Sequence, residues 1–435
     1  MTGYYLGLAV HNLRRSPWLT ALIVLAVAIG IGSSMTVLTI LHTMSGDPLP
    51  QKSARLFAPQ IANWKADDLQ PTGEPPSQLS YRDATALMGA HQGIRRTALY
   101  GTGFPVTPAD HALAPFRASG RAVYADFFAM FDAPFAGGAP WSPADDEAHA
   151  AVVVLGAKIA AKLFPHADPV GRTIDLAQHQ YRIVGVLKPW ELVPRVYDVA
   201  IFGYQDTEDV FLPFTTAIDR QLPINGNISC NAPPEPGWQG QLNSECIWQG
   251  FWVELPDAAA VARYRLFLDA YAADQQRSGR FTWPANTRLR NAQQWLVFNK
   301  VVPNDVRLNS LLGLGFLLVC LVNAIGLLLA RFNGRARDLG VRRALGASRQ
   351  NIVAQCLTET ALVGFVGGLV GLGFAALGLA AERAILPPAL AKVTHLDATM
   401  MAIIVLAAVV ATLGAGLYPV LRSSRISPSS QLRGA

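Results

Sequence analysis

The segment RFNGRARDLGVRRALGAS, residues 331–348, separates two apolar runs that are each long enough to cross a membrane. Residues 331–349 contain six arginines and one acid, Asp338. The run before the segment, 308–330, has no charge, and the run after it, 356–380, is almost uncharged. Because short loops rich in lysine and arginine stay on the cytoplasmic side, the segment is predicted to be a cytoplasmic loop between two membrane spans.

The composition of the whole chain also indicates a membrane protein. Charged residues make up 15% of its 435 residues and mean hydropathy is +0.26, whereas soluble domains contain roughly 25% charged residues. A helix needs about 20 apolar residues to cross the hydrocarbon. Spans are therefore predicted at 18–43, 307–330, 356–381 and 398–421. The first run is too long for a signal peptide and lacks a small-residue cleavage site, so we expect a retained helix.

The distribution of charge predicts the topology. Residues 47–306 contain 22 basic and 26 acidic residues, whereas the rest of the chain contains 14 basic and 4 acidic residues. A basic chain can indicate nucleic-acid binding, but here the excess lies beside the apolar runs. The segments 1–17, 331–355 and 422–435 are predicted to be cytoplasmic, and a short loop, 382–397, is predicted outside. No nucleic-acid partner is expected.

The middle region, 44–306, is predicted to be a mixed α/β domain on the far side of the membrane. It interleaves short β-type runs with helix-like stretches, a pattern typical of mixed domains. The β-type runs are 151–155, 181–187, 210–214 and 251–255, and the helix-like stretches are 80–88, 125–131, 157–164 and 258–273. Residues 218–250 are rich in proline, glycine and asparagine and are predicted to form a long, variable loop. The expected fold is thus an α-helical membrane protein with four spans and a large α/β domain between the first two.

The four cysteines divide into two kinds. Cys320 and Cys356 lie at apolar runs, where a small buried thiol is the simplest interpretation. Cys230 and Cys246 lie in the predicted loop and can form a disulfide if that region faces an oxidising compartment. Two unpaired thiols are the alternative.

No enzyme site is recognisable in the sequence. The phosphate-binding G-x-x-x-x-G-K-[ST] pattern, the H-E-x-x-H pattern and the G-x-S-x-G pattern are all missing. The acidic run 145–147 can hold a cation, but a solvated loop is the simpler interpretation. We therefore expect a non-catalytic chain that binds no metal or cofactor of its own.

Polar and small residues within the predicted spans are candidates for packing and function. Asn323 and Glu359 are polar exceptions, and a carboxylate in a membrane usually has a protein partner. Glu359 lies near the basic loop, so it is expected either to pair with a loop arginine or to reach the interface. Gly364, Gly367, Gly368 and Gly371 form two overlapping small-xxx-small pairs that allow close helix approach, within this chain or with a second subunit.

The basic loop is predicted to contain an ordered junction. Residues 338–347, DLGVRRALGA, have the pattern of a short amphipathic helix. Gly346 would end that helix and Ser348 would cap the next one. The alternative is that the arginines only set topology and contact lipid headgroups.

Several of these segments together resemble the MacB/FtsX-type ABC transporter permeases. The membrane-domain resemblance rests on the Cys320–Asn323 tetrapeptide, LLLAR at 327–331, DLGVRRALGASRQNIVAQCLTET at 338–360 and GGLVGL at 367–372. The first helix at 11–32, the core segment at 152–187 and the tail at 418–435 also resemble the family. Two features depart from it, because Asp338 replaces the usual Glu and the region around Cys230 and Cys246 matches nothing in the family pattern.

The resemblance implies a permease that works in pairs and binds a separate cytoplasmic ATPase, which carries ATP and Mg²⁺. It implies a bacterial inner-membrane location, a large periplasmic domain, contact with membrane lipid and, in some members, a periplasmic adaptor or outer-membrane factor. By analogy, the ATPase-coupling residues are Asp338, Leu339, Arg342, Arg343, Leu345, Gly346, Ala347 and Ser348. The expected function is to couple ATP hydrolysis by the partner to export of an envelope substrate such as a peptide, antibiotic, lipid or lipoprotein. A membrane-anchored receptor or assembly protein with a ligand-binding outer domain is the alternative.

Overall fold

The computed structural model describes residues 2–64, 73–108, 114–386, 388–396 and 398–424, and these form two compact units. The first unit is helical and is made of the two ends of the chain, up to residue 45 and from residue 302 onward. The second unit is the continuous segment 46–301. The most C-terminal part of the predicted cytoplasmic tail, 425–435, lies outside the described residues.

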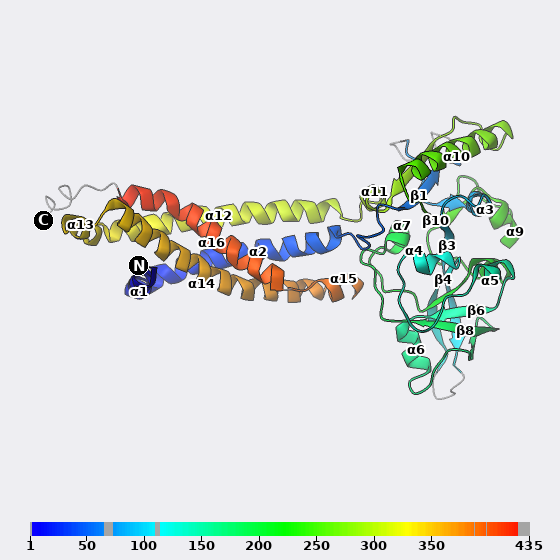
Figure 1. Cartoon of the computed structure of the whole chain (residues 1–435), viewed down its shortest axis with the longest axis horizontal. Helices are drawn as coiled ribbons and strands as arrows, with labels where there is room; N and C mark the ends of the chain where they lie inside the picture. Colours follow the sequence, from blue (N-terminus) through cyan, green and yellow to red (C-terminus); the bar gives the residue numbers. More distant parts are fainter. Residues whose placement is uncertain (1, 65–72, 109–113, 387, 397, 425–435) are drawn as a thin grey trace. The chain divides into compact units, whose positions relative to one another are not determined.

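The helical unit contains four helices long and apolar enough to cross a membrane, among the residues that the structure describes. These helices are α2 (Pro17–Ser45), α12 (Asn304–Gly334), α14 (Arg349–Arg383) and α16 (Ala398–Ser424). Three shorter helices accompany them, α1 (Thr2–Arg15), α13 (Ala336–Ala344) and α15 (Pro388–Val393). α14 packs against both α2 and α16, and α12 packs against α2 (Figure 1).

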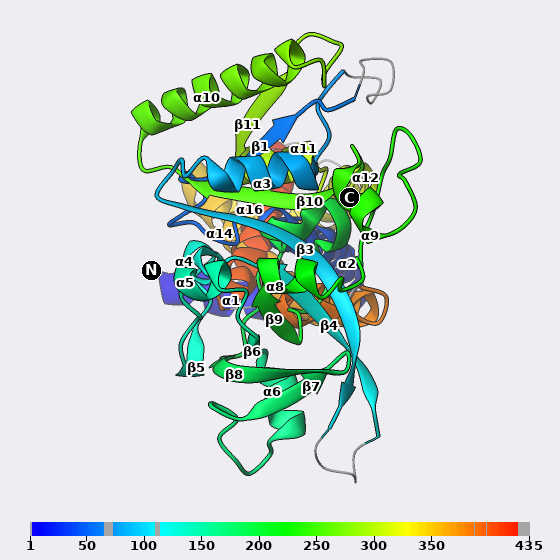
Figure 2. The same cartoon turned by 90° about the vertical axis from the view of Figure 1, so that its right-hand side faces the viewer.

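The second unit is built on a mixed eleven-stranded sheet. The main path of the sheet runs in the order β11-β1-β10-β3-β4-β9-β6-β8-β5, with β2 paired to β10 and β7 paired to β3 and β8. β3 and β4 form the long antiparallel hairpin at its centre, with Tyr100 opposite Ala122 (Figure 2). The pairs β4–β9 and β6–β8 are parallel. The strands are β1 (Leu56–Ile61), β2 (Leu79–Ser80), β3 (Arg95–Thr107), β4 (Phe116–Val123), β5 (Phe135–Gly138), β6 (Val152–Leu155), β7 (Thr173–Leu176), β8 (His179–Leu187), β9 (Val210–Pro213), β10 (Ile247–Glu254) and β11 (Thr287–Asn291).

Helices complete this unit, and two separate apolar clusters form its core. The larger cluster includes Trp248 and Tyr264, and the second includes Phe127 and Trp252. The alternation of side chains in a strand explains the division, because Phe251 and Val253 of β10 belong to the larger cluster and Trp252 between them belongs to the second. The helices are α3 (Tyr81–Gly89), α4 (Asp126–Met130), α5 (Pro143–Glu147), α6 (Ala157–Leu163), the 3₁₀ helix η2 (Val196–Asp198), α7 (Val199–Phe202), α8 (Phe214–Asp219), α9 (Trp238–Asn243), α10 (Ala258–Arg277) and α11 (Ala292–Phe298).

The structure refines several sequence expectations. The expected fold class is confirmed, because four membrane-length helices are present and a mixed α/β unit lies in the chain between the first two. The basic loop is shorter than 331–355, since α12 continues to Gly334 and α14 begins at Arg349. The segment 218–250 is not a continuous loop, because it contains α9 and the start of β10. The amino-terminal segment forms α1, and the 382–397 loop includes α15.

Candidate functional site

The basic loop folds into α13 followed by a tight junction to α14. Gly346 has φ +102°, a left-handed conformation that glycine adopts at little cost at a helix C-terminus. Its N–H donates to the carbonyl of Arg343 at 3.1 Å, and the N–H of Ala347 donates to the carbonyl of Arg342 at 3.0 Å. The Ser348 hydroxyl then accepts the N–H of Asn351 and caps α14. The structure therefore has the helix–Gly–Ala–Ser junction that the sequence predicted.

One side of α13 is packed and the other presents apolar side chains outward. Leu339 is 5% exposed and belongs to the apolar core of the helical unit. Val341 is 51% exposed and Leu345 is 83% exposed, although both are apolar. These two residues are one helical turn apart, so they form a small apolar ridge beside α13's arginines.

A buried polar cluster centred on Glu359 lies behind this junction. Arg335, at the C-terminal end of α12, donates from Nη1 to Glu359 Oε2 at 2.8 Å, and Arg331 Nη2 lies 4.0 Å from the same oxygen. The side-chain amide of Asn12, in α1, donates to the other carboxylate oxygen. Glu359 is only 2% exposed, so it pairs with the loop arginine rather than reaching the interface. The cluster ties α1, α12 and α14 together.

Two further contacts connect α13 to the cluster. Arg342 of α13 donates to Gln355 Oε1 at 3.1 Å, and Gln355 Nε2 donates to Glu359 Oε1 at 3.3 Å. On its other side, Asp338 of α13 forms an ion pair with Arg15 of α1 at 3.2 Å. The short helix is therefore held from two sides by polar contacts to the helices behind it.

The sequence analysis identified Glu359 but missed most of its partners. Arg335 and Gln355 lie in segments where many polar residues occur, so nothing in the sequence distinguished them. The one available signal was the position of Asn12 between the small or apolar residues Ala9 and Leu13 on one face of α1. A polar side chain on the inner face of a helix usually has a buried partner.

The four glycines of the small-xxx-small pairs in α14 face two neighbouring helices of the same chain. A Cβ at Gly364 or Gly368 would lie 3.0 Å from the Cα of Val409 or Val405 of α16, respectively. A Cβ at Gly367 would lie 3.0 Å from a methyl carbon of Val27, and Gly371 faces Ala28, so both meet α2. The two overlapping glycine pairs therefore serve two interfaces within this chain, the first of the two arrangements that the sequence left open.

Asn323 lies apart from these contacts. It is exposed on the surface of α12, next to Val322, which is 58% exposed. An amide on the outer surface of a membrane-spanning helix is expected to find a polar partner outside the bundle.

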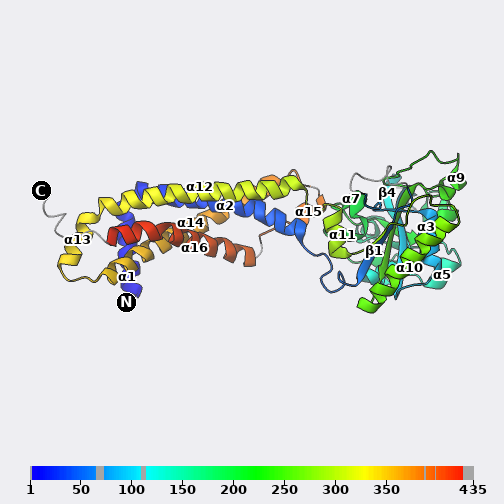
Figure 3. The same cartoon turned by 90° about the horizontal axis from the view of Figure 1, so that it is seen from above.

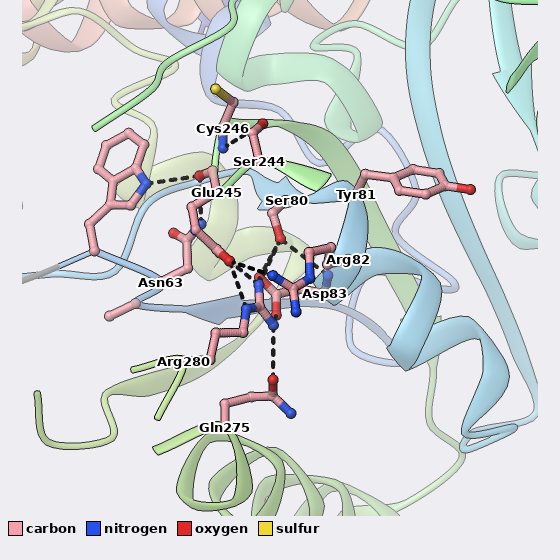
Figure 4. A network of polar contacts seen from close by, with 12 residues as sticks. Asn63, Ser80, Tyr81, Arg82, Asp83, Ser244, Glu245, Cys246, Gln275 and Arg280 are labelled. Atoms are coloured by element: carbon pink, nitrogen blue, oxygen red, sulfur yellow. Dashed lines mark hydrogen bonds and ion pairs between the residues drawn. The ribbon is translucent and has the colours of Figure 1, made fainter. Parts of the chain in front are cut away.

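In the α/β unit, Cys230 and Cys246 form a disulfide, whereas Cys320 and Cys356 of the helical unit are free and buried. Cys246 is buried and follows Glu245, whose carboxylate accepts two hydrogen bonds from Arg280, at 2.8 and 2.7 Å (Figure 4). Arg280 also donates to Asp83 of α3 at 2.7 and 3.0 Å. Burial acts to lower the pKa of Arg280, but Glu245 and Asp83 more than offset it and raise the pKa overall. The disulfide segment is thus anchored to α3 and to the chain after α10.

The acidic run 145–147 is only partly a solvated loop. Asp145 completes a capping box with Ser142 at the start of α5, and those hydrogen bonds lower its pKa. Asp146 is buried and accepts hydrogen bonds from the N–H of Ala125 and the indole of Trp141 at 2.8 and 2.9 Å. Burial nevertheless raises the pKa of Asp146 to about 7. Within the described residues no group of three acidic, histidine or cysteine side chains is placed to hold a metal ion.

Two models of known protein families match this chain. Residues 20–265, more than half of the chain, match the model of the MacB-like periplasmic core domain. The chain belongs to the MacB/FtsX-type ABC permease family. Residues 310–428 of this permease match the FtsX-like permease C-terminal model, which contains the basic loop and the Glu359 cluster. The α/β unit is therefore the periplasmic core domain of the family.

Individual relatives share about a quarter of their aligned residues with this permease. The permease is 27% identical over 387 residues to the macrolide export ATP-binding/permease protein MacB of Rhodospirillum rubrum, covering 88% of this chain and 53% of the relative. It is 25% identical over 377 residues to the pyoverdine export ATP-binding/permease protein PvdT of Pseudomonas fluorescens, covering 84% and 51%. The chain thus spans about half the length of the curated relatives it matches. The solved structure of the periplasmic region of MacB from Actinobacillus actinomycetemcomitans is 12% identical, covering 56% of this chain and 92% of that structure, at a TM-score of 0.37.

Proposed function

We propose that this permease is the membrane subunit of an export system and that α13 receives the motion of a cytoplasmic ATPase. The observation that carries the proposal is the exposed ridge of Val341 and Leu345 on a helix tied to the bundle through Gln355 and Glu359. A rigid connection of this kind suits force transmission, because a push on α13 reaches α1, α12 and α14 through the same cluster. ATP and Mg²⁺ belong to the ATPase in this proposal, and the permease itself performs no catalysis.

The names of the relatives support this assignment. Both the MacB and the PvdT relatives are export proteins whose names combine an ATP-binding part with a permease part. We propose that the ATP-binding part works here as a separate cytoplasmic subunit, and that the permease lies in the bacterial inner membrane with its core domain in the periplasm. An envelope molecule such as a peptide, antibiotic, lipid or lipoprotein is the expected substrate.

A second permease, either a copy of this chain or a relative, completes the proposed assembly. The exposed amide of Asn323 supports a further helix against α12, because an unpaired amide in hydrocarbon is unfavourable. A periplasmic adaptor or outer-membrane factor is a further partner that export across two membranes would need.

Site-specific photocrosslinking tests the ATPase assignment. A photoreactive residue at position 345 is expected to crosslink to an ATP-binding protein that copurifies with the permease. The matched control is position 385, because Ile385 is 82% exposed and follows the opposite end of α14. Leu345→Glu should also abolish copurification of the ATPase, whereas Ile385→Glu should not. Equal crosslinking from both positions, or ATPase retention by Leu345→Glu, would contradict the proposal and favour a membrane-anchored receptor.

A further inference from the structure

The outer face of α1 is apolar and cationic, and none of the described residues of the helical unit covers it. Leu6 is 50% exposed and Val10, one turn later, is 39% exposed, while Trp18 just beyond the helix is 85% exposed. Arg14 lies on the same side as Leu6 and Val10, at a spacing of four residues, and is also exposed. α1 contains no acid, and within the described part of the chain no ion pair involves Arg14. The face therefore combines apolar anchors with an available positive charge.

The position of α1 in the chain brings this face to the membrane surface. Only Ser16 separates the end of α1 at Arg15 from the start of the membrane-length helix α2 at Pro17. Figure 3 shows α1 running across the bundle rather than along it. Helices with an apolar face and basic flanks lie in the interface between headgroups and acyl chains, and tryptophan is enriched there. The outer face of α1 is therefore expected to lie on a lipid surface, because α1 is covalently connected to the membrane-length helix α2 and because Arg14 on that face is positively charged.

The inner face of the same helix touches the candidate coupling site. The amide of Asn12 donates to Glu359, and Arg331 donates to the backbone carbonyl of Asn12 at 3.3 Å. Arg15 forms its ion pair with Asp338, which belongs to α13 itself. α1 thus stands between the lipid surface and the helix that is proposed to receive the ATPase.

We propose that α1 binds anionic phospholipid of the cytoplasmic leaflet and that the bound lipid steadies α13 through Arg15 and Asn12. Arg14 binds the lipid phosphate, while Leu6, Val10 and Trp18 enter the acyl boundary. Arg15 stays on Asp338, so immobilising α1 also restrains α13. Anionic lipid thereby regulates the coupling site. This regulatory role rests on the proposed function, whereas the binding of lipid to α1 does not.

The test uses the full chain in nanodiscs of phosphatidylcholine alone or with one-third phosphatidylglycerol, without any ATPase. Hydrogen exchange of the α13 amides is expected to be about fivefold slower in the anionic discs, the factor that corresponds to ~1 kcal/mol for one basic side chain at an anionic surface. Native mass spectrometry should show retained phosphatidylglycerol. Arg14→Gln should lose both effects. The matched control is Arg422→Gln, an exposed arginine near the end of α16, which should keep both.

A third variant separates binding from transmission. Asp338→Asn leaves α1 unchanged and removes the ion pair with Arg15, so lipid retention should persist while the slowing of α13 exchange falls by on the order of half. Equal exchange in the two kinds of disc, or full lipid retention by Arg14→Gln, would overturn the proposal. The same slowing produced by inorganic phosphate in phosphatidylcholine discs would also overturn it, because the occupant would then be a free anion. Since no ATPase is present, this test can fail while the crosslinking test succeeds, and the reverse.

Discussion

Arg335 and Glu359 form an ion pair, with 2.8 Å between Nη1 and Oε2, that joins the end of α12 to the interior of α14. The residues between them include the whole of α13, so the pair closes the base of the basic loop. Arg331 lies 4.0 Å from the same carboxylate oxygen, which gives two arginines to one acid in a buried cluster. Glu359 therefore supplies the negative charge that makes the burial of Arg331 and the partial burial of Arg335 tolerable.

Glu359→Gln is expected to destabilise the helical unit strongly. Removing one partner of a buried ion pair leaves the other charge uncompensated, which costs about 3–5 kcal/mol. The thermal midpoint of the full chain in detergent should fall by several degrees. Glu382→Gln, near the other end of α14, is the matched control and should leave the midpoint within a degree or so of the native value. Equal midpoints for the two variants would show that the cluster does not hold the helices together.

Gly368→Val should separate α14 from α16. Its Cβ would lie 3.0 Å from the Cβ of Ala408 and 3.0 Å from the Cα of Val405, so backbone rather than a flexible side chain must move. Overpacking of this kind costs roughly 1–3 kcal/mol. Gly373→Val is the control on the same helix, because a Cβ there meets nothing within 4 Å. The measurement is the thermal midpoint in detergent, and a loss in Gly373→Val as large as in Gly368→Val would contradict the assigned interface.

The features that the sequence predicted well are those with local signals. The four spans follow from apolar runs, and β6, β8 and β9 follow from short apolar segments. The end of α13 was predictable because Gly346 is the residue that a left-handed helix terminus favours. These features depend on neighbours within a few positions, which one sequence contains.

The features that the sequence did not predict depend on distant neighbours. β3 contains Gly101, Gly103 and Pro105, residue types that are uncommon in strands, yet pairing with β4 and β10 makes it a central strand. α9 formed inside the expected loop for a similar reason, since Leu242 packs into the core. The contact between Asn12 and Glu359 joins residues 347 positions apart. A single chain without related sequences gives no signal for a contact of that separation.

Removing the disulfide should loosen the segment between Cys230 and Cys246. The two cysteines are 16 residues apart, and a loop of about 15 residues corresponds to ~3 kcal/mol of stabilisation. The Cys230→Ala/Cys246→Ala variant should therefore unfold its α/β unit at a lower temperature. Thiol labelling after non-reducing denaturation should modify two cysteines in the native chain, Cys320 and Cys356, and four after reduction. Four labelled thiols without reductant would contradict the disulfide.

The last prediction concerns the pH dependence of the α/β unit. The pKa of Asp146 is raised to about 7 by burial, from an ordinary 3.8, so between about pH 4 and 7 the folded state binds more protons than the unfolded state. Asp146 therefore contributes up to about 4 kcal/mol to the free energy of unfolding below pH 4. This contribution is lost as the pH rises through 7.

Thermal midpoints of the native chain and of Asp146→Asn, measured from pH 5 to 8, test this dependence. The native midpoint should fall across that range, and the fall should be smaller in Asp146→Asn, whatever its absolute stability. Asp145→Asn is the control with the opposite sign, because hydrogen bonds from Ser142 lower the pKa of Asp145. The stabilisation that Asp145 provides is present above its ordinary pKa and disappears only as the pH falls below it. The pH 5–8 slope of Asp145→Asn should therefore stay close to that of the native chain, since the charge of Asp145 is a lesser cause of the raised pKa of Asp146 than burial. If the thermal midpoint of Asp146→Asn falls with pH as steeply as that of the native chain, the group responsible for the pH dependence is not Asp146.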